Sequence, residues 1–108
     1  MQRISDPIVD RFLERCREMG EKIQAVYLFG SRAKGTARPD SDYDLLLVVG
    51  VGFSLDDKDV LYDGVMEILL DTGRLVSLKI FREPEFHRLC ELRTPFMTHV
   101  LTEGIKVG

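Results

Sequence analysis

Apolar residues recur along the chain with two different periods. Between Pro7 and Gly20 they return every three or four positions with charges between them, which predicts an amphipathic helix that starts at Ser5-Asp6-Pro7, with a capping oxygen before the proline, and has Gly20 as its C-cap. A second helix is predicted over residues 54–72, with Ser54 as its capping residue. The residues expected on its buried face are Val60, Leu61, Val65, Ile68 and Leu69. Prolines in the first turn predict two short helices, over 83–91 and 94–104.

Short runs of β-branched and large apolar residues predict the strands. These runs are residues 23–29, 43–49 and 75–81, and residues 105–107 are expected to add a short edge strand. The run 43–49 is apolar at both alternating sets of positions, which is typical of a strand covered by helices on both faces. The order of elements predicts an α/β (α+β) fold with a small central sheet flanked by helices. The pattern leaves the direction of the strands open.

Length and charge narrow the class of protein. A chain of 108 residues predicts one domain over residues 1–108. Its net charge of -3 and the lack of a basic stripe argue against broad nucleic-acid binding. The distant Cys16 and Cys90 are expected to be thiols rather than a disulfide. Without a signal peptide or a membrane-length apolar run, we expect a cytoplasmic protein.

A pair of carboxylates begins the second predicted strand. Asp42 and Asp44 are two residues apart, so their side chains leave the same face. Two carboxylates that converge on one point repel each other unless a cation lies between them, and oxygen ligands of this kind suit Mg²⁺. Alternatively, Asp42 caps the preceding turn and Asp44 is solvated.

A glycine–serine turn follows the first predicted strand. Gly30 lets a ligand approach the backbone, and Ser31 offers a hydroxyl and an amide at the start of a short helix expected between Arg32 and Ala37. Arg32 and Lys34 add positive charge for a triphosphate. Alternatively, both basic side chains are solvated surface cations.

Together these residues resemble a known signature. Gly30 and Ser31, ten intervening residues, then Asp42 and Asp44 are similar to the motif of the DNA polymerase β-like nucleotidyltransferase superfamily. The chain most resembles the minimal nucleotidyltransferase (MNT) proteins, whose fold has a small mixed sheet.

The resemblance implies an activity, cofactors and partners. An AMP group, or another nucleoside monophosphate, would pass from ATP or another NTP to a hydroxyl. Gly30, Ser31, Arg32 and Lys34 would bind the nucleotide, and Asp42 and Asp44 would be the catalytic ligands of two Mg²⁺ ions. The acceptor would be a tyrosine of a HEPN-family partner in a toxin–antitoxin pair, so a homo- or hetero-oligomer is expected.

The chain departs from that family on its third strand. Active members usually carry a third carboxylate there, whereas this chain offers Ser77 and Lys79. Lys79 either reaches the carboxylate pair and replaces a cation, or extends into solvent. Two hypotheses follow: an active nucleotidyltransferase, or a catalytically impaired nucleotide-binding or antitoxin-like module.

Overall fold

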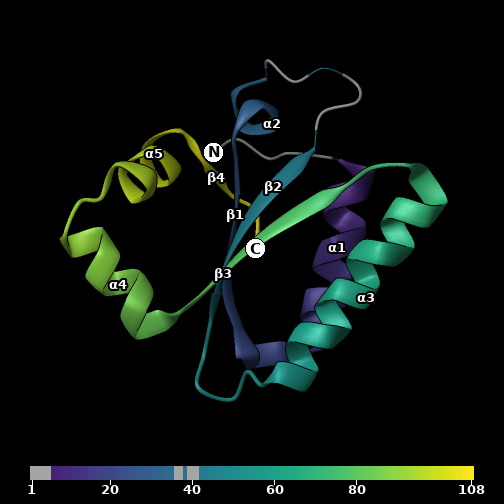
Figure 1. The fold of residues 1–108 in the computed structure, drawn as a ribbon, viewed down its shortest axis with the longest axis horizontal. Helices are drawn as coiled ribbons and strands as arrows, with labels where there is room; N and C mark the ends of the chain where they lie inside the picture. Colours follow the sequence, from purple (N-terminus) through teal and green to yellow (C-terminus); the bar gives the residue numbers. More distant parts are fainter. Residues whose placement is uncertain (1–5, 36–37, 39–41) are drawn as a thin grey trace.

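The computed structural model describes residues 6–35, 38 and 42–108, which form helices packed on both faces of a mixed sheet (Figure 1). The strand order is β3-β2-β1-β4; β1 pairs antiparallel with β2 and β4, and β2 pairs parallel with β3. The strands are β1 Ile23–Phe29, β2 Tyr43–Val49, β3 Val76–Arg82 and β4 Ile105–Lys106. The predicted fold class is confirmed, and the strand directions that the pattern left open are now defined.

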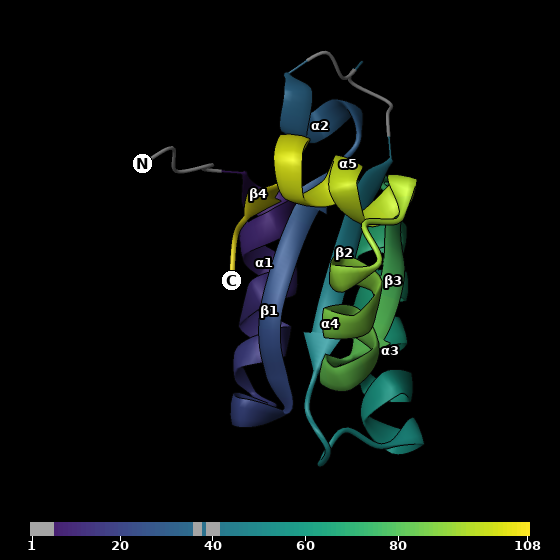
Figure 2. The same cartoon turned by 90° about the vertical axis from the view of Figure 1, so that its left-hand side faces the viewer.

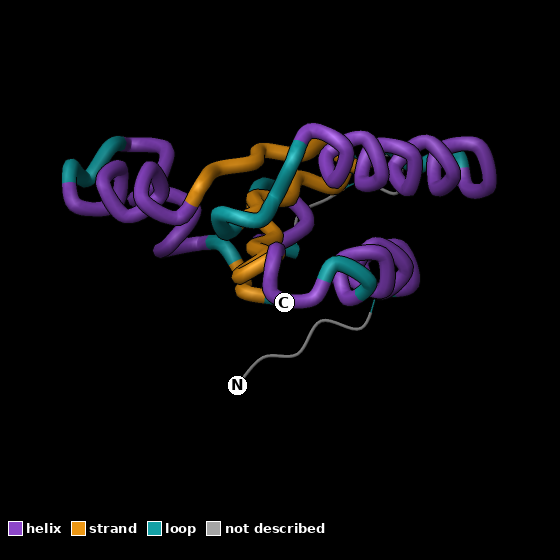
Figure 3. Tube along the Cα trace, turned by 90° about the horizontal axis from the view of Figure 1, so that it is seen from below, coloured by secondary structure: helices purple, strands orange, loops and turns teal. Residues whose placement is uncertain are grey.

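Two layers of helices enclose the sheet. Helices α1 and α3 cover one face, and α4 and α5 cover the other (Figures 1 and 2). Seen from below, the strands run between these two groups of helices (Figure 3). The helices are α1 Pro7–Arg17, α2 Ser31–Lys34, α3 Leu55–Thr72, α4 Glu83–Glu91 and α5 Pro95–Glu103. No helix among the described residues is long and apolar enough to cross a membrane.

The helix starts follow from local chemistry. Asp6 accepts a hydrogen bond from the amide of Ile8 at 2.8 Å and so caps α1, as predicted. Ser54 and Asp57 form a reciprocal capping box at the start of α3, also as predicted. The predicted end of α1 is wrong: the helix ends at Arg17, and a 3₁₀ turn over Gly20–Lys22 leads into β1.

Strand β2 contributes to both halves of the core. Leu45 and Leu47 pack with α1 and α3, whereas Leu46 and Val48 pack with α4 and α5. Every residue of β2 except Asp44 is buried. The prediction of a strand covered on both faces is therefore confirmed. Asp44 is the one residue of β2 that is only half-buried.

One residue of α3 that was predicted to be buried is exposed. Val60 is 38% exposed, and the buried face contains Gly64 instead. A Cβ on Gly64 would lie 3.1 Å from Nε of Arg15, because α1 crosses α3 at this point. Periodicity alone could not reveal which glycine lies at a helix crossing.

Both cysteines are free thiols, as predicted. Cys16 lies on the buried face of α1, and burial raises its pKa to about 12. Cys90 is half-buried, and burial also raises its pKa. Neither thiol is therefore activated as a nucleophile at neutral pH.

Candidate active site

The predicted phosphate turn and the predicted carboxylates lie at the same end of the sheet. Phe29, the last residue of β1, is the register partner of Asp44 near the start of β2. Because the two strands are antiparallel, Gly30 and Ser31 leave β1 beside the point where β2 begins (Figure 1). The structure therefore brings Gly30, Ser31 and Asp44 together, although the chain between them is long.

Gly30 is fitted closely to Asp44. Its backbone has φ +77° and ψ −158°, a conformation that is open almost only to glycine. A Cβ at this position would lie 2.6 Å from Oδ2 of Asp44. The missing side chain therefore lets the carboxylate of Asp44 lie directly against the backbone of the turn.

Asp42 and Asp44 interact electrostatically. Asp44 is half-buried, whereas Asp42, just before β2, is exposed. Burial raises the pKa of Asp44, the negative charge of Asp42 raises it further, and the positive charge of Lys79 opposes both. A half-buried carboxylate beside a second carboxylate favours a bound cation, and hard oxygen donors suit a divalent ion such as Mg²⁺. Within the described parts of the chain, no set of three His, Cys, Asp or Glu side chains surrounds a common point.

Ser31 supplies hydrogen-bond donors next to this pair. It is the first residue of α2, a position whose amide has no partner inside the helix. Helix α2 is a single turn that ends at Gly35, so its overall dipole is small. The predicted phosphate contact at Ser31 would therefore depend on local N–H and O–H groups. The predicted extension of α2 to Ala37 reaches residues 36 and 37, which lie outside the described residues.

The third strand places a serine and a lysine beside Asp44. Ser77 is the register partner of Asp44, and Lys79 is the partner of Leu46, the next residue on the same face of β2. Ser77 thus lies next to the carboxylate pair, at the level where a third acidic residue was expected. Lys79 is exposed one step further along β3.

The sequence matches the model of the family "Nucleotidyltransferase domain" over residues 9–93. The chain belongs to this family. As a nucleotidyltransferase it is an enzyme, and its predicted resemblance to the minimal nucleotidyltransferases is confirmed.

The known proteins that this chain resembles are consistent with this family assignment. The nucleotidyltransferase is 33% identical to "Putative protein adenylyltransferase MJ1305" of Methanocaldococcus jannaschii, over 98% of this chain and 72% of the relative. A crystal structure of a toxin–antitoxin with AMP-PNP has the same fold, with a TM-score of 0.59 and 20% identity over 90% of this chain and 69% of the other. A "putative nucleotidyltransferase" from Sulfolobus solfataricus aligns with a TM-score of 0.58 and 20% identity over 92% of this chain and 75% of the other.

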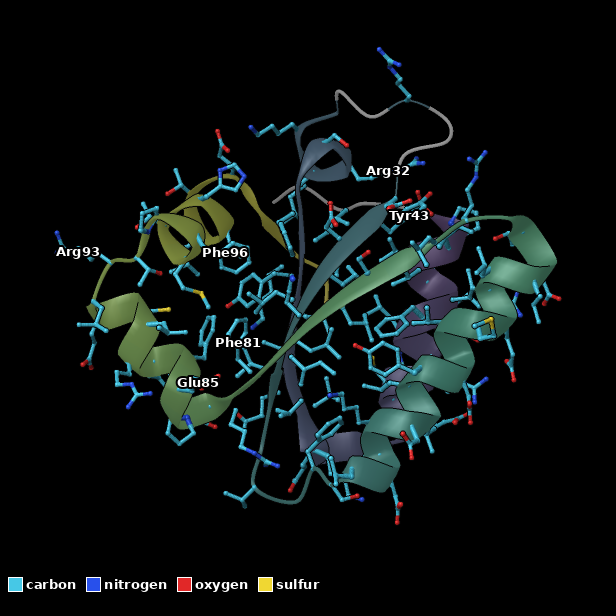
Figure 4. All side chains as sticks on the ribbon, viewed as in Figure 1. Arg32, Tyr43, Phe81, Glu85, Arg93 and Phe96 are labelled. Atoms are coloured by element: carbon cyan, nitrogen blue, oxygen red, sulfur yellow. The ribbon has the colours of Figure 1, made fainter. Side chains whose placement is uncertain are left out.

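Arg32 of the nucleotidyltransferase stacks on a tyrosine. Its guanidinium carbon lies 4.2 Å from the centroid of the Tyr43 ring, and Figure 4 shows the two side chains at the upper end of β2. The Tyr43 hydroxyl donates a 2.8 Å hydrogen bond to Oδ2 of Asp6, the residue that caps α1. Tyr43 and Asp44 point to opposite faces of β2. Arg32, which is predicted to bind the nucleotide, thus also connects α2 through Tyr43 to the core between the sheet and helices α1 and α3.

Lys34 pairs with a distant helix. Its ammonium lies 3.1 Å from Oε2 of Glu103 at the end of α5, and Nδ1 of His99 lies 2.7 Å from the same oxygen. All three side chains are partly exposed to solvent. An exposed ion pair of this kind is weak, so a triphosphate could compete with Glu103 for Lys34.

Glu103 and His99 were not expected as neighbours of the site, and neither was the contact between Tyr43 and Arg32. The place of Tyr43 between Asp42 and Asp44 was the available signal for that contact. Glu103 is far from Lys34 in the sequence and carried no signal. Only the packing of α5 against β1 brings Glu103 close to α2 (Figure 2).

Proposed function

We propose that this nucleotidyltransferase moves AMP from ATP to a hydroxyl group of an acceptor protein, with Mg²⁺ bound by Asp42 and Asp44. The observation that carries the proposal is the fit between Gly30 and Asp44, because it joins a phosphate-binding turn to a carboxylate pair. Phosphoryl-group chemistry requires these two parts side by side.

The proposed reaction is a displacement at phosphorus. The acceptor oxygen forms a bond to the α-phosphorus of ATP, the bond from that phosphorus to the bridging oxygen breaks, and pyrophosphate leaves. The acceptor proton passes to solvent water. Ser31 binds an oxygen of the departing phosphates through its amide and hydroxyl, and Gly30 leaves room for the phosphate chain. Mg²⁺ bound between the carboxylates would stabilise the charge that develops on the phosphates.

In this proposal the two basic residues support the binding of the triphosphate. Lys34 leaves Glu103 and pairs with the triphosphate, and Arg32 keeps α2 in position through Tyr43 while its charge faces the same region. Other nucleoside triphosphates share the same phosphate contacts, so the preference for ATP rests on the similarity to the adenylyltransferase relative.

The proposed acceptor is a tyrosine hydroxyl of a HEPN-family partner in the cytoplasm. The relative from Methanocaldococcus jannaschii is named a protein adenylyltransferase, which supports a protein acceptor. A structural neighbour is a toxin–antitoxin with AMP-PNP, which supports a nucleotide site and a partner. This small fold has little surface of its own for selecting an acceptor, so a stable hetero-complex would supply that selectivity.

Transfer of labelled AMP tests the proposal. The protein is incubated with α-labelled ATP, Mg²⁺ and a purified HEPN protein, and label on the acceptor is measured. We expect transfer that falls at least about a hundredfold in Asp42→Asn and Asp44→Asn. Asp56→Asn, on the exposed side of α3, is the matched control and should remain active. A tyrosine-to-phenylalanine series in the acceptor identifies the modified hydroxyl.

A binding-only module is the second candidate, and Ser77 is the observation that favours it. A serine beside Asp44 cannot act as a strong general base. In that case the protein would bind the acceptor tightly without transfer, and binding would be unchanged by Asp42→Asn and Asp44→Asn. Label transfer that depends on both carboxylates excludes this second function.

A further inference from the structure

A lysine shares one face of the sheet with the carboxylate pair. Alternation along β3 puts Val76 and Leu78 in the core with α1 and α3, so Ser77 and Lys79 face the side of α4 and α5. Asp44 faces the same side, because its neighbour Leu46 packs there. The three side chains of Asp44, Ser77 and Lys79 therefore form one polar patch on two adjacent strands.

The helices leave this polar patch open while they cover the rest of the face. Phe96 of α5 packs on Phe29, with ring centroids 5.4 Å apart. It also packs on Phe81, with ring centroids 6.5 Å apart (Figure 4). Phe86 of α4 stacks on Tyr27 at 6.0 Å. These aromatic contacts occupy β1 and the far end of β3, whereas Lys79 remains exposed. The patch is thus accessible to a ligand.

Lys79 is within reach of Asp44. Adjacent strands lie about 4.8 Å apart and the chain rises about 3.3 Å per residue, so Cα atoms of diagonal neighbours are about 8 Å apart, a distance that the flexible four-carbon stem of a lysine spans. Ser77 pairs with Asp44 and Lys79 pairs with Leu46, so Lys79 and Asp44 are diagonal neighbours of opposite charge. Among the described side chains, Lys79 forms no ion pair with Asp44 or with any other carboxylate, so its ammonium is available to a ligand.

The charges at this site suit one divalent ion better than two. Two divalent ions in a shared site lie about 3.5–4 Å apart and repel strongly unless several anionic ligands surround them. Asp42 and Asp44 are a sufficient carboxylate set for a single Mg²⁺ ion. Ser77 adds no negative charge, and the ammonium of Lys79 would repel a second ion beside Asp44.

We propose that this site binds one divalent cation, at Asp42 and Asp44, and that Lys79 supplies the second positive charge, next to Asp44, for the triphosphate. The inference rests on the proposed function and specifies how the site works without a third carboxylate. Lys79 is then a binding residue for the nucleotide in place of a second metal ion.

Counting bound Mn²⁺ tests the inference. Electron paramagnetic resonance measures Mn²⁺ bound per chain in the presence of α,β-methylene-ATP, which cannot be cleaved at the reacting bond. We expect one ion in the unmodified protein and in Lys79→Met, and two in the double variant Ser77→Asp, Lys79→Met. Affinity for the analogue should fall about five- to tenfold in Lys79→Met, which loses one charge-assisted contact. Lys58→Met, on α3, is the matched control and should leave both readouts unchanged.

The outcomes separate this inference from the proposed function. Two ions in the unmodified protein, or an unchanged nucleotide affinity in Lys79→Met, would overturn the role of Lys79 and leave the proposed function intact. A folded double variant that still binds one ion would also overturn it. No Mn²⁺ at all would overturn the proposed function as well. If circular dichroism shows the double variant unfolded, the other two proteins still decide the question.

Discussion

The carboxylate of Asp44 occupies the space that a side chain on Gly30 would need. An added Cβ would be 2.6 Å from Oδ2 of Asp44, and the φ of +77° already restricts this position to glycine. The glycine that follows β1 and the carboxylate near the start of β2 are therefore fitted to each other as one unit. This unit is the centre of the proposed nucleotide site.

Gly30→Ala should destabilise the fold. We expect the free energy of unfolding in urea to fall by about 2–4 kcal/mol, because the alanine adopts a strained conformation and meets Asp44. Gly20→Ala is the control, since it also has a positive φ of +58° but nothing within 4 Å of the added Cβ. It should lose about 1–2 kcal/mol. Equal losses in the two variants would contradict the close fit.

Asp44→Asn should stabilise the protein at neutral pH without metal. Burial raises the pKa of Asp44 above its ordinary 3.8, so the folded state binds this proton more tightly than the unfolded chain. The group therefore contributes stability below pH 3.8 and loses that contribution as the pH rises through the raised pKa. We expect Tm at pH 7 to rise by about 2 °C or more in the asparagine variant.

The pH dependence distinguishes this effect from a change in packing. The gain in Tm should shrink towards pH 3, where the carboxyl is protonated in both states. Asp56→Asn, on the exposed side of α3, serves as the control and should show no such trend. A gain that is equal at pH 3 and pH 7 would argue against the buried charge as its cause.

Substitutions of Tyr43 should separate its hydroxyl from its ring. Tyr43→Phe removes the 2.8 Å hydrogen bond to Asp6, and we expect the free energy of unfolding to fall by about 1 kcal/mol. Tyr43→Leu also removes the ring under Arg32 and should lose about 2–3 kcal/mol in total. Urea titrations measure both losses. If the ring positions Arg32 for the nucleotide, ATP affinity should fall in Tyr43→Leu and stay unchanged in Tyr43→Phe.

Lys34 and Glu103 should affect nucleotide binding more than stability. Their ion pair is exposed, so Lys34→Met should change the free energy of unfolding by less than about 1 kcal/mol. We expect calorimetry to show about tenfold weaker ATP binding in Lys34→Met. Binding should be tighter in Glu103→Gln, which releases the lysine. Lys106→Met, on the edge strand, is the matched control; weaker binding in Glu103→Gln would mean that Glu103 holds Lys34 in its binding position.

Local chemistry made much of the fold predictable. Asp6 and Ser54 mark helix starts through side-chain hydrogen bonds to nearby amides, and these contacts depend only on adjacent residues. The apolar run in β2 and the alternation in β3 likewise depend on short-range periodicity. Val60 was misassigned because periodicity does not show where α1, which is distant in the sequence, packs against α3.

The sequence by itself determined the parts of the candidate site: a glycine–serine turn, a carboxylate pair, and a third strand that carries Ser77 and Lys79 in place of an acid. Their residue types and spacing suffice for that much, because each part is local. Only the tertiary structure decided that Gly30 contacts Asp44, that Ser77 lies beside that carboxylate, and that Lys34 pairs with Glu103. Strand register and helix packing fix these contacts, and both depend on long-range burial that no short stretch of sequence encodes.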